Sequence, residues 1–176
     1  MAVHLPRRVA EQIKTAAKEA APEEACGVLI GKGILISGAI PVPNAAAFPE
    51  RAYVLDPPSL LKAINHAQTT DQELLGFYHS HPKHDPRPSS LDIREWNYPD
   101  LLMIIISLTA DKIAAWRVNG VEVTPIELTF DAASSTVAEI PLSNAGKTAI
   151  IVSVILAILA VLVVSFTLLP PAPPIP

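Results

Sequence analysis

The distribution of charge divides this chain of 176 residues into two parts. Every Lys, Arg, Asp and Glu lies at or before Lys147, and none follows it. The 22 residues 148–169, TAIIVSVILAILAVLVVSFTLL, would form a helix about 33 Å long, enough to cross a hydrocarbon core of about 30 Å. A buried core helix of this length would normally keep a polar face, which the segment lacks. We therefore expect a transmembrane helix at 148–169 and a folded domain before it.

The sequence around this segment predicts four parts. The folded domain should occupy residues 1–130, followed by a polar linker at 131–147, the span at 148–169 and a proline-rich tail at 170–176. Because Lys147 flanks the span on its N-terminal side and the tail carries no charged side chain, the positive-inside tendency leaves the domain in the cytoplasm. The N-terminal MAVHLPRRVAEQIK lacks an apolar core, so we expect no secretory signal peptide.

Composition excludes two broad classes. Hydrophobic residues make up 50% of the chain and charged residues 17%, which is too apolar for a disordered protein. A net charge of −4 offers no basic surface, so nucleic acid is not an expected partner. The single cysteine, Cys26, cannot form an internal disulfide, which suits a reducing compartment. A buried strand thiol is the simplest interpretation of Cys26.

Hydrophobic periodicity in the first 130 residues predicts an α/β domain with a mixed β-sheet and flanking helices. Helices are expected at 7–20, 57–70 and 89–97, where apolar positions recur at helical spacing or a proline opens the segment. Strands are expected at 25–31, 33–42, 51–56, 74–80, 101–108 and 112–118, with one or two more in 121–130.

The most informative stretch is GFYHSHPKHDPRPSSLD, residues 76–92. His79 and His81 are two apart at a strand end, so both imidazoles point to one face. Ten residues lie between His81 and Asp92, and a loop of that length can return the Asp92 carboxylate to the same point. Two nitrogens and one oxygen from protein leave a fourth position for water, which is the arrangement of a catalytic zinc site.

These residues resemble the JAMM/MPN-plus family of zinc metalloproteases. The pattern of that family is an early glutamate, His-x-His, ten residues and an aspartate, with a serine three before the aspartate. Glu24 in PEEACGVLIG, the His79–His81 pair followed by proline, and Ser89 before Asp92 match it. The resemblance covers about residues 5–130 and implies a cytidine-deaminase-like α/β fold.

The resemblance also implies a mechanism and a substrate class. His79, His81 and Asp92 would hold Zn²⁺, and Glu24 would act as general base toward a zinc-bound water. The Ser89 hydroxyl would donate to the developing oxyanion. The reaction would be peptide or isopeptide cleavage after the C-terminal glycine of a ubiquitin-like or sulfur-carrier protein, at a membrane surface because of the predicted span.

Several residues allow a simpler interpretation. Ser89 and Asp92 also fit a helix capping box, which could hold together with the oxyanion role. The family glutamate stands two residues before the Cys-Gly pair, which selects Glu24, whereas Glu23 is expected to be a solvated charge. The spacing of three further histidines, His4, His66 and His84, does not indicate a metal site, although His84 lies in the loop between the ligands.

Two competing functions remain open at this level. A catalytically silent MPN-type module that binds protein at a membrane would share the fold, but silent relatives usually lose a ligand and this chain has all three. The RadC group has a similar His-x-His-Pro and Ser-x-x-Asp pattern with an additional N-terminal region of DNA-binding type. The acidic charge and the apolar segment rank it last. The short intervals around the ligands favour a minimal prokaryotic-type enzyme.

Overall fold

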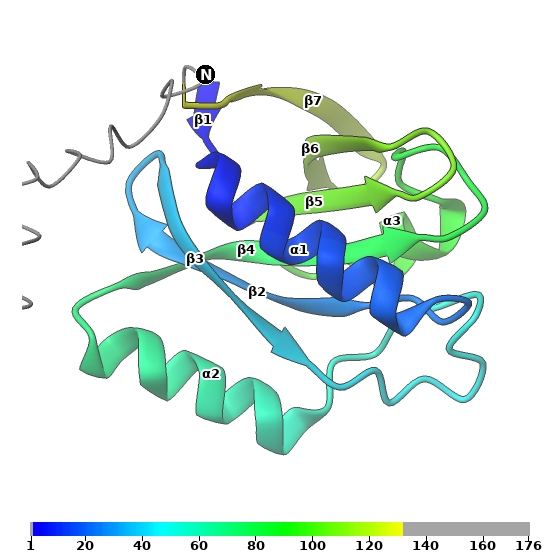
Figure 1. The fold of residues 1–176 in the computed structure, drawn as a ribbon, viewed down its shortest axis with the longest axis horizontal. Helices are drawn as coiled ribbons and strands as arrows, with labels where there is room; N and C mark the ends of the chain where they lie inside the picture. The colour runs from blue at the N-terminus through cyan, green and yellow to red at the C-terminus, as the bar shows by residue number, and fades with distance from the viewer. Residues whose placement is uncertain (1, 132–176) are drawn as a thin grey trace, which may run out of the picture. The chain divides into compact units, whose positions relative to one another are not determined.

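The computed structural model describes residues 2–131 (Figure 1). The chain separates into two units, the first of which is Met1–Ala132. The predicted span (148–169), the tail (170–176) and all but the first residue of the linker (131–147) lie outside the described residues. Within the described part, no helix is both long and apolar enough to cross a membrane.

Seven strands and three helices make up the described part of the chain. The strands are β1 (Ala2–His4), β2 (Cys26–Lys32), β3 (Leu35–Val42), β4 (Glu73–His81), β5 (Leu102–Ser107), β6 (Lys112–Asn119) and β7 (Glu122–Thr129). The helices are α1 (Arg7–Ala20), α2 (Pro57–Thr69) and α3 (Ser90–Glu95).

The strands form one mixed sheet in the order β1-β3-β2-β4-β5-β6-β7. Strand β4 pairs with β2 antiparallel and with β5 parallel, so the strand that carries the two histidines is central. The sheet closes into a barrel because β1 pairs in parallel with both β3 and β7. The mixed sheet confirms the predicted fold class. The closure was not predicted, because the three residues of β1 are too few to show a period.

Helices α1 and α2 pack on opposite faces of the sheet (Figure 1). Helix α1 packs against a cluster that includes Leu29, Tyr78 and Ile104, whereas α2 packs against a cluster that includes Val28 and Phe77. Neighbours along β2 and β4 therefore belong to different clusters, as strand alternation requires. The face of β4 that holds Phe77 is the face on which the predicted ligands lie.

Two local predictions need correction. The segment 51–56 is not a strand, because its backbone makes only an isolated bridge between Asn44 and Leu55 and otherwise belongs to a long connection. Helix α3 begins at Ser90 rather than 89, because Ser89 is its N-cap. The stretch 121–130, where one or two strands were predicted, forms one, β7.

Candidate metal centre

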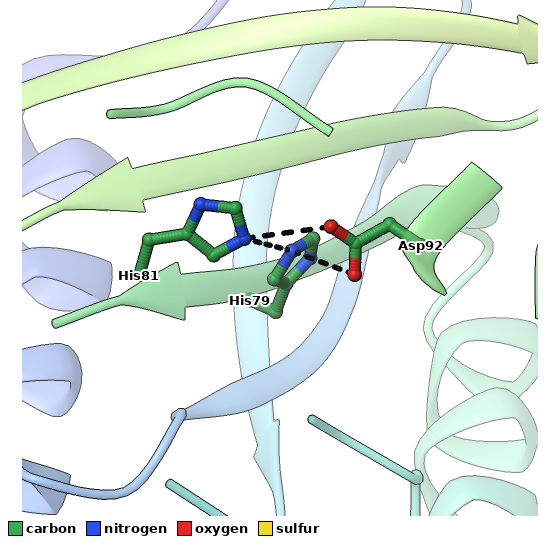
Figure 2. Close-up of side chains that lie close together, drawn as sticks. All are labelled: His79, His81 and Asp92. Carbon is green, nitrogen blue, oxygen red and sulfur yellow. Dashed lines mark hydrogen bonds and ion pairs between the residues drawn. The ribbon is translucent and has the colours of Figure 1, made fainter. Parts of the chain in front are cut away.

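The three predicted ligands converge at one end of β4 (Figure 2). His79 and His81 lie at the C-terminal end of β4 and point to the same face of the sheet. Ser80, between them, points to the opposite face. The chain then loops back, and Asp92 reaches from the first turn of α3 toward both imidazoles. All three side chains are buried.

The distances among these three side chains fit one tetrahedral metal ion. The Nε2 atoms of His79 and His81 are 3.1 Å apart. Each lies 3.5 Å from one carboxylate oxygen of Asp92. Metal–ligand bonds of about 2.0–2.1 Å place neighbouring ligand atoms of a tetrahedral zinc site about 3.3–3.4 Å apart. The donor set of two imidazole nitrogens and one carboxylate oxygen is that of open, catalytic zinc sites.

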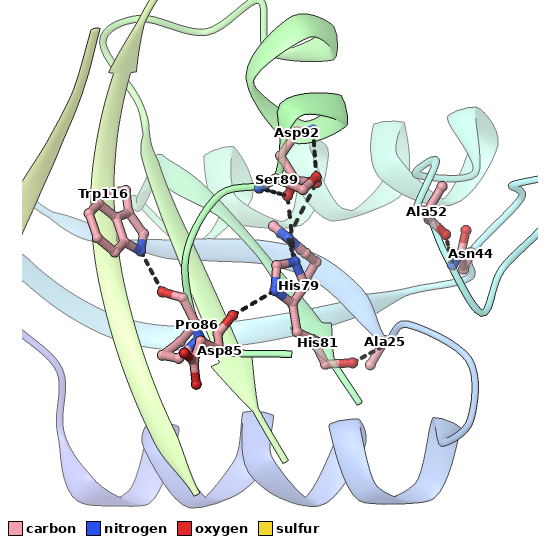
Figure 3. A network of polar contacts seen from close by, with 11 residues as sticks. Ala25, Asn44, Ala52, His79, His81, Asp85, Pro86, Ser89, Asp92 and Trp116 are labelled. Atoms are coloured by element: carbon pink, nitrogen blue, oxygen red, sulfur yellow. Dashed lines mark hydrogen bonds and ion pairs between the residues drawn. The ribbon is translucent and has the colours of Figure 1, made fainter. Parts of the chain in front are cut away.

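A hydrogen bond sets the ring of His81 (Figure 3). Its Nδ1 lies 2.9 Å from the backbone carbonyl oxygen of Asp85, which can only accept, so Nδ1 carries the proton and Nε2 keeps its lone pair for a metal. The same loop is held from the sheet by Trp116, whose ring N–H donates to the carbonyl of Pro86 at 2.9 Å.

Electrostatics acts differently on the three ligands. Burial lowers the pKa of His79, so this imidazole is held neutral. Burial would lower the pKa of His81 too, but its contacts with Asp92 and with the Asp85 carbonyl raise it. Burial would raise the pKa of Asp92, but its contacts with the two imidazoles and with Ser89 hold it well below its usual range. A neutral imidazole beside an ionised carboxylate is the form that binds a divalent cation.

Glu24 lies just before β2 and lines the same cavity as His81 and Ser89. Its side chain is 6% exposed, and its Oε2 atom is buried without a protein partner among the described residues. Burial raises the pKa of Glu24 from its ordinary value of 4.5 to about 7, which His81 opposes and Asp92 reinforces. A carboxyl with a pKa near neutrality can both accept and release a proton. Glu23 is exposed, as expected of a solvated charge.

Ser89 forms the predicted capping box with Asp92 (Figure 3). Its Oγ accepts from the Asp92 N–H at 3.1 Å, and its own N–H donates to Oδ2 of Asp92 at 2.7 Å. The cap thus orients a ligand carboxylate. In this arrangement the Ser89 oxygen accepts a hydrogen bond, and the hydroxyl lies beside the Asp92 carboxylate in the wall of the cavity that Glu24 also lines.

Two cavities border the metal centre. One, of about 640 Å³, has several charged side chains in its wall and includes Glu24, His81 and Ser89. The other, of about 500 Å³, is mostly apolar and is lined by Asp92 and by aromatic side chains that include Tyr53 and Trp96. Asp92 thus borders the apolar cavity, and His81 borders the other.

Sequence reasoning missed three residues of the site, namely Asn44, Tyr53 and Ser80. Tyr53 stacks on His79, and Asn44 donates to the backbone carbonyl of Glu24 at 2.9 Å. The Oγ of Ser80 accepts from the N–H of Ala25 at 2.9 Å, next to Glu24. Only the position of Ser80 could have been inferred from the sequence, because strand alternation turns its side chain to the face opposite the two histidines. No sequence motif marks Asn44 or Tyr53.

The remaining histidines and the cysteine lie where the simpler interpretations put them. His66 and His84 are exposed, and the His84 ring lies 6.5 Å from that of His81. His4 contacts Asp131 at 2.8 Å, far from the ligands in sequence. Cys26 is buried, and burial raises the pKa of its thiol to about 12, so it is not a nucleophile at neutral pH.

Comparison with known proteins agrees with this geometry. The family model described as prokaryotic homologs of the JAB domain matches residues 6–119, well over half of the chain. The chain belongs to this family. His79, His81 and Asp92 are the zinc-binding motif of the JAMM/JAB domain, and zinc is its cofactor.

Two relatives have informative names. Desampylase of Haloferax volcanii is 39% identical over 88 residues, which cover 49% of this chain and 63% of the relative. The probable TtuB-protein conjugate cleaving protease of Thermus thermophilus is 36% identical over 101 residues, which cover 56% of this chain and 68% of the relative. The chain thus spans slightly under two thirds of the desampylase.

Solved structures show the same fold. A Desulfitobacterium hafniense protein, 30% identical, superimposes with a TM-score of 0.67 over 73% of this chain and 92% of its own. A JAB1/MPN domain protein from Archaeoglobus fulgidus, 22% identical, has a TM-score of 0.51 over 73% of this chain and 98% of its own. The described domain therefore has the JAB/MPN fold.

Proposed function

We propose that this protein is a zinc-dependent isopeptidase or peptidase that cleaves after the C-terminal glycine of a ubiquitin-like or sulfur-carrier protein. The observation that carries the proposal is the convergence of the His79, His81 and Asp92 side chains, together with a neighbouring cavity lined by Glu24 and Ser89. The names of the two relatives, a desampylase and a conjugate-cleaving protease, support the same reaction class.

Glu24 is the residue suited to move the proton. With a pKa near 7, its carboxylate can take a proton from the attacking water and pass it to the leaving amine. When bound, zinc supplies a Lewis acid that lowers the pKa of water and polarises the scissile carbonyl. His79, His81 and Asp92 would hold it, and none of them needs to titrate during the reaction.

Ser89 is the residue suited to stabilise the oxyanion. Its side chain lines the cavity beside Glu24 and His81, and the cap that it forms keeps the hydroxyl oxygen fixed relative to Asp92. A donor held in place before the reaction stabilises developing negative charge without reorganisation. The cap and the oxyanion role therefore use different parts of the same hydroxyl.

The shape of the site suits an extended tail. The apolar cavity beside Asp92 offers aromatic walls from Tyr53 and Trp96, and its volume of about 500 Å³ fits one or two side chains. The segment between β4 and α3, residues 82–89, is short, and no long insertion stands between the ligands in sequence. A flexible protein terminus enters such a site more readily than a folded surface does.

The apolar segment 148–169 supports a finer proposal about location. We propose that it anchors the chain as a single C-terminal span with the catalytic domain in the cytoplasm, so that cleavage occurs near a membrane surface. The boundaries 1–130, 131–147 and 170–176 for domain, linker and tail belong to the same proposal. Fractionation tests it: the intact chain should sediment with membranes and resist extraction by carbonate, whereas intact chain in the cytosolic fraction would contradict it.

The catalytic proposal is tested by incubating the purified full chain with ubiquitin-like and sulfur-carrier proteins extended beyond their terminal glycine. Mass spectrometry should show a new C-terminus at that glycine, and cleavage should disappear in chelator-treated protein and in Glu24→Gln. Zinc-loaded protein that binds these partners but cuts none would instead identify a binding module.

A further inference from the structure

The two histidine ligands are held in different ways. His81 donates its second ring N–H to the carbonyl of Asp85, as metal-ligating imidazoles usually do. The corresponding Nδ1 of His79 is buried, and the described residues offer it no hydrogen-bond partner. Because the ring of His79 is fully buried, another contact must determine its orientation.

Tyr53 makes that contact. Its ring lies face to face with the imidazole of His79, with centroids 4.3 Å apart and planes inclined by 19°. The ring of His81 lies against the same imidazole at 5.0 Å with a 60° tilt. A flat neighbour at stacking distance blocks rotation of an imidazole about its own side-chain axis. The stack therefore restricts the direction of the Nε2 lone pair of His79.

The loop that carries Tyr53 is itself held in place. We name residues 43–56 the clamp loop. The Nδ2 of Asn44 donates to the carbonyl of Ala52 at 3.0 Å (Figure 3). The Oδ1 of Asn44 accepts from the N–H of Val54 at 3.0 Å, so both chain neighbours of Tyr53 are bound. The same Nδ2 donates to the backbone carbonyl of Glu24. One amide thus connects the loop to the segment of the predicted base.

We propose that Tyr53 is a positioning residue for zinc binding, which acts through His79 by fixing the orientation of its imidazole. The stack takes the place that the hydrogen bond to Asp85 takes for His81. The inference deepens the proposed function, and only its kinetic readout rests on that function, since metal affinity can be measured without a substrate.

Tyr53 also lines the apolar cavity, and this position predicts a different result. A side chain that only forms a wall for the substrate would change KM when replaced and leave metal affinity untouched. A side chain that positions His79 would change metal affinity and kcat, whether or not KM changes. The two roles are therefore separable by measurement.

The experiment uses the full chain with Tyr53→Phe, which keeps the ring, and Tyr53→Leu, which keeps an apolar side chain but removes the flat face. Val54→Ala is the matched control, because it alters the neighbouring part of the same cavity wall without touching the stack. If Tyr53→Leu does not fold, Tyr53→Met replaces it, since a flexible thioether fills irregular space. Zinc affinity is measured by chelator competition, and coordination by the visible spectrum of the cobalt-substituted protein.

We expect Tyr53→Phe and Val54→Ala to bind zinc within about twofold of the parent, and Tyr53→Leu to bind about tenfold more weakly, the low end for partners that orient a ligand. The cobalt spectrum should change only in Tyr53→Leu, and its kcat should fall. Parental zinc affinity and spectrum in Tyr53→Leu, with only KM raised, would overturn the proposal, as would equal loss in Val54→Ala. Failure of every variant and the parent to cleave would count against the proposed function alone, because the metal readouts would still decide the role of Tyr53.

Discussion

The metal centre is built from two regions that are encoded in different ways. The ligand segment, residues 76–92, places its donors by strand alternation and by a capped helix, so their relation depends on local geometry. The clamp loop has no regular structure apart from one bridge, and the side chain of Asn44 holds it together. The metal ligands and Ser89 thus come from the first region, whereas the second supplies contacts to His79 and to the backbone of Glu24.

The largest effect should follow from removing a ligand. In His81→Ala, zinc affinity should fall by more than 100-fold, beyond the roughly 10–100-fold typical of residues that orient ligands. The matched control is His84→Ala, an exposed histidine three residues further on, which should bind zinc as the parent does. Isothermal titration of metal-depleted protein measures both. Equal loss in the two variants would mean that the loop, and not a particular imidazole, binds the metal.

Ser89→Gly should lower kcat by about 10²–10³-fold, the cost of losing one oxyanion donor. Glycine is tolerated at an N-cap at a cost of a few tenths of a kcal/mol, so the helix and zinc affinity should persist. Ser89→Thr keeps a hydroxyl and should remain active. Steady-state kinetics and thermal unfolding measured together check this. If Ser89→Gly kept the kcat of the parent, Ser89 would only cap α3 and would not stabilise the oxyanion.

A smaller effect is expected in the clamp loop. Asn44→Ala leaves two backbone N–H groups and two carbonyls without their partner, at about 1–3 kcal/mol of unfolding free energy. The kcat should fall about tenfold because Glu24 and Tyr53 lose their common support. Asn97→Ala removes a single exposed hydrogen bond and should stay within about 0.5 kcal/mol. Urea unfolding and kinetics measure both. If Asn44→Ala were destabilised but kept the kcat of the parent, the clamp loop would contribute to stability and not to catalysis.

The smallest effect concerns pH. In metal-depleted protein, folding raises the pKa of Glu24 from 4.5 to about 7, so the folded chain holds this proton more tightly than the unfolded chain. The contribution of Glu24 to stability is thus complete below about 4.5 and is lost as pH rises through 7. Glu24→Gln has no such proton, so its stability relative to the parent should increase across that window. Urea unfolding at several pH values checks this, and parallel profiles would contradict the buried position of Glu24.

The part of the site that could be predicted follows the same division. A period of two places His79 and His81 on one face of their strand, and the interval of ten residues allows Asp92 to return to them. The family resemblance then predicted all three as ligands. Ser89 fitted both a helix cap and an oxyanion donor. The structure shows the cap, and the donor role stays a prediction.

The part that could not be predicted depends on contacts between residues distant in sequence. The stack between Tyr53 and His79 joins positions 26 residues apart, and nothing in the apolar pattern of 51–56 separates a strand from an irregular loop. The closure of the sheet depends on β1, which is too short for any period to be visible. The conformation of residues 43–56 depends on tertiary hydrogen bonds, mostly those of Asn44, which the local sequence pattern does not indicate.

The most direct test of the account measures zinc content and cleavage on the same preparation of Glu24→Gln. The account predicts one zinc per chain, as in the parent, together with a cleavage rate lowered by at least about 100-fold, because the ligand set is intact and only the proton acceptor is lost. Cleavage at the parental rate would contradict the assignment of Glu24 as the base. Loss of zinc from this variant would contradict the separation of metal binding from proton transfer.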